Sequence, residues 1–516
     1  MTNYTEVFDG ALPSHGQMER LLEILSAIAN KDGGQIPSQV EYGIRLTLGA
    51  DGNLASTPTG QRVMRYGGAV TEWNPTFTPN VGDGEGNITI NQNDFDLIPI
   101  FSPDTVTDAA GNVFARFKPF WVAEQDMGGY RYIWVCETQL YPFYRMPKAF
   151  IRGGQVGYRD IGIYEGSFET AEDVEYLCSK SGKNPAHNRT RTQFWNDAQA
   201  WQTRLSVDTE REWYGITQIS EITEILQPLM TIAFGTLNTQ SVFKGATSFN
   251  YTYCDTGVAV AAYDESTMTV YSSVTAAANN FPVGGTVNIN SNEASEDYYR
   301  EITASGTVKG SVEGTTFTPS EDGTDYLFVT MAGSTFPATP TTICARPAWT
   351  GQTDDIQASN GTPSDDGFHS FKMFKIENIY GNIYKQVLDV SINDYTPMQL
   401  KDPYAFTEFS SATYQDYYNA ASYQVGNANG YATVITSRED MSDVALTTAA
   451  GGSSTTYYCD YYNNPGSSSP KTVYYGGHLA YGASAGGWSW NLHYGVGYSR
   501  WSLGARLSRW VTLQGG

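Results

Sequence analysis

Large apolar side chains recur at spacings of three and four near the start of the chain. Residues 14–31 place five of them on one stripe: Met18, Leu21, Leu22, Leu25 and Ile28. This period is that of an amphipathic helix. A helix this short is stable only if its apolar face is buried. The helix could associate with two further copies of itself or pack against the next part of the chain. Gly33 then ends the pattern.

The same period predicts two helices further along the chain. Residues 192–203 bring Phe194, Ala198 and Trp201 to one face. Pro228 lies inside the second pattern, residues 220–234, where its ring removes a backbone donor, and we expect a kink or a helix boundary there. The apolar face of this second helix comprises Ile222, Ile225, Leu226, Leu229 and Ala233.

Alternating apolar and polar positions predict strands elsewhere. Residues 40–90 alternate short apolar runs with the turn signals Asp51-Gly52 and Asp83-Gly84, which predicts a small β domain. Residues 250–365 are rich in Thr, Ser, Val and Gly and alternate again, which predicts a β-rich insertion. The predicted fold class is α+β.

The C-terminal end has an unusual composition. From Tyr474 to Trp501 there are eight Tyr or Trp residues, two His and one Arg, and no Asp, Glu or Lys. Large amphipathic rings separated by Gly, Ser and Asn are typical of antibody-like binding surfaces. The alternative is a Gly-rich hairpin whose rings pack into a core.

The binding-surface interpretation makes specific residues ligand contacts. Leu492 and Leu503 are expected in the core instead. Arg506 lies in a predicted final strand, where a charge persists only if the fold hydrogen-bonds it. The predicted ligand-binding residues are His478, Tyr481, Trp488, Trp490, Asn491, His493, Tyr494, Tyr498, Ser499, Arg500 and Trp501.

A series of motifs follows a fixed order along the chain. In this order they resemble phage and prophage tail proteins with a C-type-lectin fold, the fold of formylglycine-generating enzymes. The C-terminal region of these proteins is diversified by retroelements, as in phage tropism determinants. The motifs are DLIP at 96–99, GNVFAR at 111–116, PKAFIRGG at 147–154, IYEGSF at 163–168, FGTLNTQS at 234–241, FKMFKIENIYGNIY at 371–384, the paired small residues at 476–477, 482–483 and 485–486, and GARL at 504–507.

The resemblance implies both an architecture and a function. Residues 94–516 would form the C-type-lectin-like domain, interrupted by the insertion at 250–365, with a variable ligand-binding region at 476–507. The resemblance does not cover residues 1–93. From the apolar stripe at 18–28 and the symmetry common in tail fibres, we expect this region to form a homotrimer and to attach the protein to other virion tail proteins. The implied function is receptor binding, with a bacterial cell-surface protein or glycan as ligand. The chain departs from the family at Phe374-Lys375, where the family has Arg-Gly.

Charge and hydropathy exclude some partners. The 516 residues carry a formal charge of −23, so nucleic acid and anionic membranes are poor partners. No run of 18 apolar residues occurs, and the first ten residues do not resemble a signal peptide. We therefore expect synthesis in the host cytoplasm and a place on the virion. After Asp460 the only charged residues are basic, Lys471, Arg500, Arg506 and Arg509, so we expect local positive charge at this end.

Signals for catalysis or metal binding are weak. The five cysteines are scattered, and only Cys459 follows the 371–384 motif, whereas a formylglycine-generating oxidase needs a late pair. Trp195-Asn196-Asp197 spells a calcium motif of animal lectins but falls in a predicted helix. We expect no enzyme activity, no cofactor and no metal. Two alternatives remain open: a polysaccharide depolymerase, which needs two carboxylates about 5–10 Å apart, and a diversified surface-display protein of a bacterium.

Overall fold

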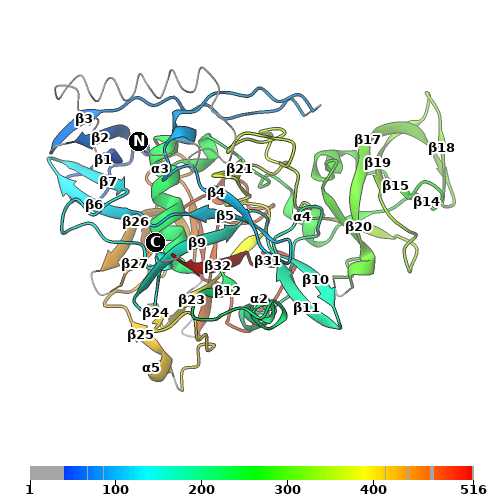
Figure 1. Ribbon diagram of the computed structural model, residues 1–516. Helices are drawn as coiled ribbons and strands as arrows, with labels where there is room; N and C mark the ends of the chain where they lie inside the picture. Colours follow the sequence, from blue (N-terminus) through cyan, green and yellow to red (C-terminus); the bar gives the residue numbers. More distant parts are fainter. Residues whose placement is uncertain are drawn as a thin grey trace, which may run out of the picture.

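The computed structural model describes residues 40–513 except 67, 85, 294, 413, 439–440, 465 and 467–469. The fold is mixed and strand-rich, with several sheets and few helices, so the broad α+β prediction is confirmed (Figure 1). The predicted helix at 14–31 lies outside the described residues. In the part that is described, no helix is long and apolar enough to cross a membrane.

The first sheet has the order β3-β2-β1-β7-β6. Strand β1 pairs with β2 on one side and with β7 on the other, and its Ile44 and Leu46 are buried. This sheet crosses the predicted boundary at residue 93, because β1 finds its second partner after that boundary. Its strands are β1 (Glu41–Thr47), β2 (Gln61–Tyr66), β3 (Ala69–Glu72), β6 (Trp121–Met127) and β7 (Tyr130–Cys136).

The C-terminal strand β32 (Leu507–Thr512) lies inside a second sheet, of order β12-β32-β9-β5-β4 with β8 on β9. It runs antiparallel to both neighbours, with Trp510 opposite Trp213 and Arg159. The end of the chain therefore completes a sheet begun far upstream. The other strands are β4 (Asp104–Thr107), β5 (Val113–Phe117), β8 (Ile151–Arg152), β9 (Gln155–Gly162) and β12 (Glu212–Ile216), and beside them lies the hairpin of β10 (Ser167–Ala171) and β11 (Val174–Cys178).

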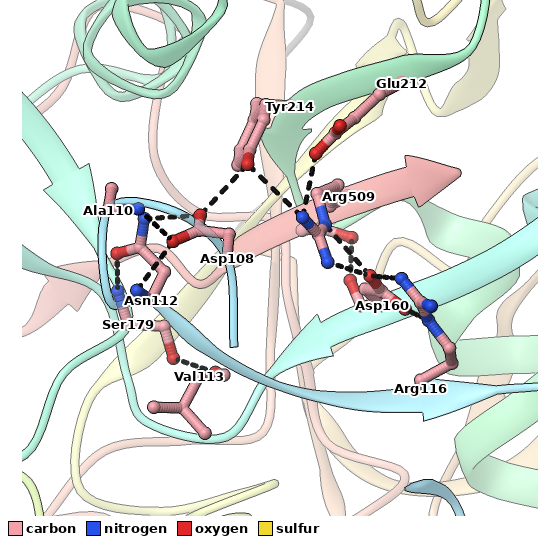
Figure 2. A network of polar contacts seen from close by, with 11 residues as sticks. Asp108, Ala110, Asn112, Val113, Arg116, Asp160, Ser179, Glu212, Tyr214 and Arg509 are labelled. Atoms are coloured by element: carbon pink, nitrogen blue, oxygen red, sulfur yellow. Dashed lines mark hydrogen bonds and ion pairs between the residues drawn. The ribbon is translucent and has the colours of Figure 1, made fainter. Parts of the chain in front are cut away.

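Ion pairs between buried side chains connect β32 to its neighbours in this sheet. Asp160 of β9 accepts hydrogen bonds from Arg116 of β5 at 2.7 and 2.8 Å and from Arg509 of β32 at 2.9 and 2.6 Å (Figure 2). Arg509 also donates to Glu212 of β12 at 2.8 Å. One carboxylate and one guanidinium thus connect four neighbouring strands, and removal of either would leave a buried charge unpaired.

The two predicted helices of the core are present. Helix α2 (Arg191–Arg204) begins with a capping box between Thr190 and Gln193, and the predicted face is buried, as expected. The second begins as a π-helical segment, η4 (Glu221–Leu226), and continues as α3 (Gln227–Phe234) with Pro228 in its first turn. The predicted boundary at Pro228 is confirmed, because proline is tolerated where a helix starts.

The β-rich character predicted for the insertion at 250–365 is confirmed, and this segment forms a lobe at the right of Figure 1. Its sheet has the order β13-β20-β16-β17-β19-β15-β14, with β18 on β17. The short helix α4 (Tyr251–Asp255) precedes it. Its strands are β13 (Val258–Ala259), β14 (Ala262–Asp264), β15 (Thr269–Ser272), β16 (Thr286–Ile289), β17 (Tyr299–Glu313), β18 (Thr316–Pro319), β19 (Thr324–Met331) and β20 (Thr342–Arg346).

The largest sheet has the order β25-β24-β23-β29-β30-β28-β26-β27, with β31 on β23. Three of its strands, β29, β30 and β31, come from the aromatic C-terminal region. A hairpin of β21 (Lys372–Met373) and β22 (Ile376–Glu377) precedes the sheet, and α5 (Tyr414–Tyr417) lies between β24 and β25. Its strands are β23 (Tyr384–Asn393), β24 (Thr396–Leu400), β25 (Tyr418–Ala420), β26 (Gly430–Arg438), β27 (Met441–Ala450), β28 (Tyr461–Asn463), β29 (Lys471–Tyr475), β30 (Trp490–Asn491) and β31 (Leu503–Gly504).

Candidate ligand-binding surface

The motif at 371–384 builds a buried polar support beneath the C-terminal region. Asn378 and Asn382 have positive φ angles of 47° and 54°, and both side-chain amides donate to Glu165. Lys385 forms an ion pair with the same carboxylate at 2.7 Å. All of these side chains are buried. The motif is therefore structural, since a ligand could not reach it from solvent.

Arg506 is tied to this support as the sequence predicted. Its guanidinium donates to the carbonyl oxygens of Gly162 at 2.8 Å and Ile163 at 3.0 Å, and to those of Glu377 at 2.6 Å and Asn378 at 2.9 Å. The side chain is buried. Four backbone acceptors thus depend on one residue. Arg506 itself lies directly before the final strand β32 rather than inside it, so its predicted strand position is corrected by one residue.

Five of the eleven predicted ligand contacts are buried, so the prediction is corrected for them. The Trp490 ring packs on Tyr475 at a centroid distance of 5.3 Å, because β30 lies inside the largest sheet. Trp501 joins the core of the insertion, with Arg346 over its ring at 4.9 Å. Such rings fill space inside the fold and do not face a ligand. The five are His478, Trp488, Trp490, Asn491 and Trp501.

The other six predicted contacts do reach solvent. Residues 493–500 form a loop between β30 and β31, in which His493, Tyr498 and Ser499 are exposed. Tyr494 and Tyr498 stack at 4.5 Å with only 3° between their planes, and His493 meets Tyr494 edge-on at 4.8 Å. Tyr494 is half-buried, like Tyr481 and Arg500.

Tyr481 continues this aromatic group across the sheet. Tyr481 and Tyr494 both pack on a small buried cluster that contains Tyr384. On its other side the Tyr481 ring lies near that of Tyr461, with a centroid distance of 6.4 Å. The Tyr461 ring in turn lies 5.4 Å from that of Tyr431, again between centroids. We call the six half-buried or exposed rings the tyrosine surface: Tyr431, Tyr461, Tyr481, His493, Tyr494 and Tyr498.

The insertion adds a residue that no sequence pattern predicted. Tyr251 of α4 is 45% exposed, and its hydroxyl accepts a hydrogen bond from Arg500 at 2.7 Å. Arg500 also forms an ion pair with Asp255 of the same helix. The two partners are more than two hundred residues apart in sequence, and only the packing of the insertion on the C-terminal region joins them. Tyr431 and Tyr461 were likewise not predicted.

The expected positive charge does not reach this surface. Lys471, Arg506 and Arg509 are buried, and Arg500 is paired with Asp255. Burial, with a smaller effect of Arg500, lowers the pKa of His478 to about 3. Partial burial and Lys471 lower the pKa of His493 as well. Both histidines are therefore neutral at neutral pH, and the surface is aromatic and polar rather than basic.

A hollow of about 840 Å³ adjoins the loop at Ser499. It lies between the β10–β11 hairpin, the segment 182–189 and the insertion, and Phe168, Tyr299 and Trp349 are among its walls. The backbone amide of Asn188 donates to the carbonyl of Arg500 at 3.2 Å, which fixes the loop beside the hollow.

The Trp195-Asn196-Asp197 sequence lies on α2, as predicted. Burial raises the pKa of Asp197 to about 6. Within the described ranges, no group of three or more His, Cys, Asp or Glu side chains could hold a metal ion. All five cysteines are free and buried.

No protein-family model matches the chain, and no curated protein matches it either.

Proposed function

We propose that the protein is a receptor-binding protein of a phage or prophage particle, with a C-type-lectin-like domain that presents the tyrosine surface to a bacterial cell-surface protein or glycan. The supporting observation is the loop 493–500. It carries exposed aromatic and polar side chains, yet both of its ends are held by buried strands of the largest sheet. A rigid frame with amphipathic rings on one loop is suited to binding, because little rotamer freedom is lost on contact.

The topology supports the proposed domain. The final strand β32 pairs between β9 and β12, and the helices α2 and α3 lie on either side of β12 in the sequence. The motifs at 163–168, 371–384 and 504–507 meet in the bonds of Glu165, Asn378 and Arg506. Motifs far apart in sequence that meet in one support favour a common scaffold over chance similarity.

Attachment of the full-length protein to a panel of bacterial strains tests this function. A fluorescent protein should label some strains, and Tyr494→Ala together with Tyr498→Ala should remove most of the labelling. Protease treatment of the cells would remove a protein ligand, and periodate oxidation a glycan. Labelling that the double variant leaves unchanged would refute the tyrosine surface as the binding site.

We propose further that the particle carries the protein as a homotrimer, assembled and attached through residues 1–93. Three copies would raise avidity for a repeated surface ligand even where each site binds weakly. Light scattering on the full-length protein should return three times the 56.7 kDa chain mass. A monomer mass would contradict this arrangement.

A further inference from the structure

A second hollow, of about 1000 Å³, is lined by none of the residues of the tyrosine surface. Its walls come from β8 and the start of β9 on one side, and from β23, β24 and the loop 401–405 on the other. None of the eleven predicted ligand contacts lines it. Its size is at the upper end of the roughly 300–1000 Å³ range of ligand pockets. We call it the β8–β24 cleft.

Asp389 lines the cleft and is only 3% exposed. The backbone amide of Ile219 donates to its Oδ1 at 2.8 Å, and no Lys or Arg of the described residues forms an ion pair with it. Burial raises the pKa of Asp389 to about 7, and the nearby Asp443 and Glu221 add to this shift. At neutral pH the carboxyl group can therefore accept a hydrogen bond or donate one.

Gln218 also lines the cleft and is only 2% exposed. Its backbone amide donates to Glu221 at 2.9 Å, but its side-chain Nε2 has no partner among the described residues. A buried N–H group without an acceptor costs free energy, because it has given up its hydrogen bonds to water. A ligand oxygen that accepted from Gln218 would recover this cost.

The charges of the lining nearly cancel, with four acidic and three basic side chains. Asp443 already has partners within the protein. Lys148 Nζ lies 2.5 Å from its Oδ1, and the side-chain amide of Gln399 donates to its Oδ2. Much of the remaining wall consists of amide and hydroxyl side chains. This balance favours neither a polyanion nor a polycation. The charged residues are Glu210, Asp389, Asp402, Asp443, Lys148, Arg152 and Lys401.

We propose that the β8–β24 cleft binds an uncharged oligosaccharide, with sugar hydroxyls that donate to Asp389 and accept from Gln218. A hydroxyl group is both a donor and an acceptor, so a polyhydroxylated chain satisfies both buried side chains at once. A ligand amine would form a hydrogen bond with Asp389 but not with the amide N–H of Gln218. A ligand carboxylate or phosphate would accept from Gln218 but could not donate to Asp389. The site is independent of the tyrosine surface and takes a second ligand.

The test uses the full-length protein on a microarray of neutral oligosaccharides from bacterial capsules and lipopolysaccharide O-chains, with acidic oligosaccharides and immobilised spermidine as comparison spots. Neutral spots should bind. Ala405→Trp, an exposed position of the cleft wall, should weaken this binding by about tenfold or more. Ala259→Trp, an exposed position in β13, is the matched control and should change nothing. Asp389→Asn, which keeps the acceptor for Ile219, should weaken binding too.

The same array distinguishes this proposal from the proposed function. Neutral-glycan binding that survives Tyr494→Ala with Tyr498→Ala but falls in Ala405→Trp supports the cleft. The reverse result would assign the glycan to the tyrosine surface and overturn the proposal. Failure of every neutral spot to bind, or binding to acidic or spermidine spots alone, would overturn it as well.

Discussion

Two neighbouring parts of the C-terminal region have similar residue types and opposite environments. Residues 488–492 and 501–510 are buried throughout, whereas most of the loop 493–500 reaches solvent. The buried parts contain β30, β31 and β32, which pair with other strands on at least one side. The loop between them makes one isolated bridge, from Gly495 to Lys471.

The difference shows that packing against neighbouring elements, rather than composition, decides which rings are buried. Trp490 lies on a paired strand, whereas Trp488 and Trp501 lie in turns and are buried as well. A ring on a paired strand is covered by the neighbouring strands and by the layer beneath. A ring on the loop is covered on one side only. An aromatic stretch can therefore supply both buried rings and solvent-exposed rings within a few residues, and the following predictions test where the division lies.

The largest expected effect is that of Trp490→Ala. The indole is fully buried, and its loss should lower the free energy of unfolding by about 3–5 kcal/mol through lost burial and a cavity. Urea denaturation followed by fluorescence measures this. Trp490→Phe is the control, with a smaller loss, because the indole Nε1 has no partner in the described part of the chain. An alanine variant as stable as the parent would show that the Trp490 ring is exposed rather than buried.

Arg506→Ala should lower the free energy of unfolding by about 1–3 kcal/mol, because buried carbonyl groups lose their donor. Arg506→Lys, which retains a charge and some donors, should lie between the parent and the alanine variant. Thermal melts of the three proteins provide the comparison. Identical melting temperatures would show that these carbonyls have other donors in solution.

His478 and His493 should respond differently to acid. The folded pKa of His478, about 3, lies below its unfolded value, so the unfolded state binds more protons below about pH 6.5 and stability falls as the pH drops. This linkage amounts to about 2 kcal/mol at pH 5. His478→Gln should remove that part of the acid sensitivity. In NMR titrations His493 should become protonated at a higher pH than His478, because His493 is exposed and His478 is buried. Simultaneous protonation would contradict the burial of His478.

Tyr498→Ala should have the smallest effect on stability, about 0.5 kcal/mol or less, because the ring is already 39% exposed. Attachment to cells should nevertheless weaken by about 1 kcal/mol or more if the ring is a hot spot. Tyr417→Ala on α5 is the matched control, since this ring is 44% exposed and lies outside the tyrosine surface. Equal attachment of the two variants would place Tyr498 outside the binding site.

Local periodicity was enough to predict several elements. The helix faces at 194–201 and 222–233, the boundary at Pro228 and the β-rich insertion all follow from spacings of a few residues, which fix which side chains share a face. The hydrogen-bonded state of Arg506 followed from its place in a predicted strand, because a buried charge requires partners wherever it lies.

Only the tertiary structure decided which residues of the aromatic region are exposed. Burial depends on partners that are distant in sequence, such as Tyr475 and β28 around Trp490, or the insertion around Trp501 and Arg500. The same reason explains why the first sheet crosses residue 93. It also explains why Asp389 and Gln218, unremarkable in sequence, face one cleft: the walls of a cavity come from several elements, and no local pattern records how those elements pack.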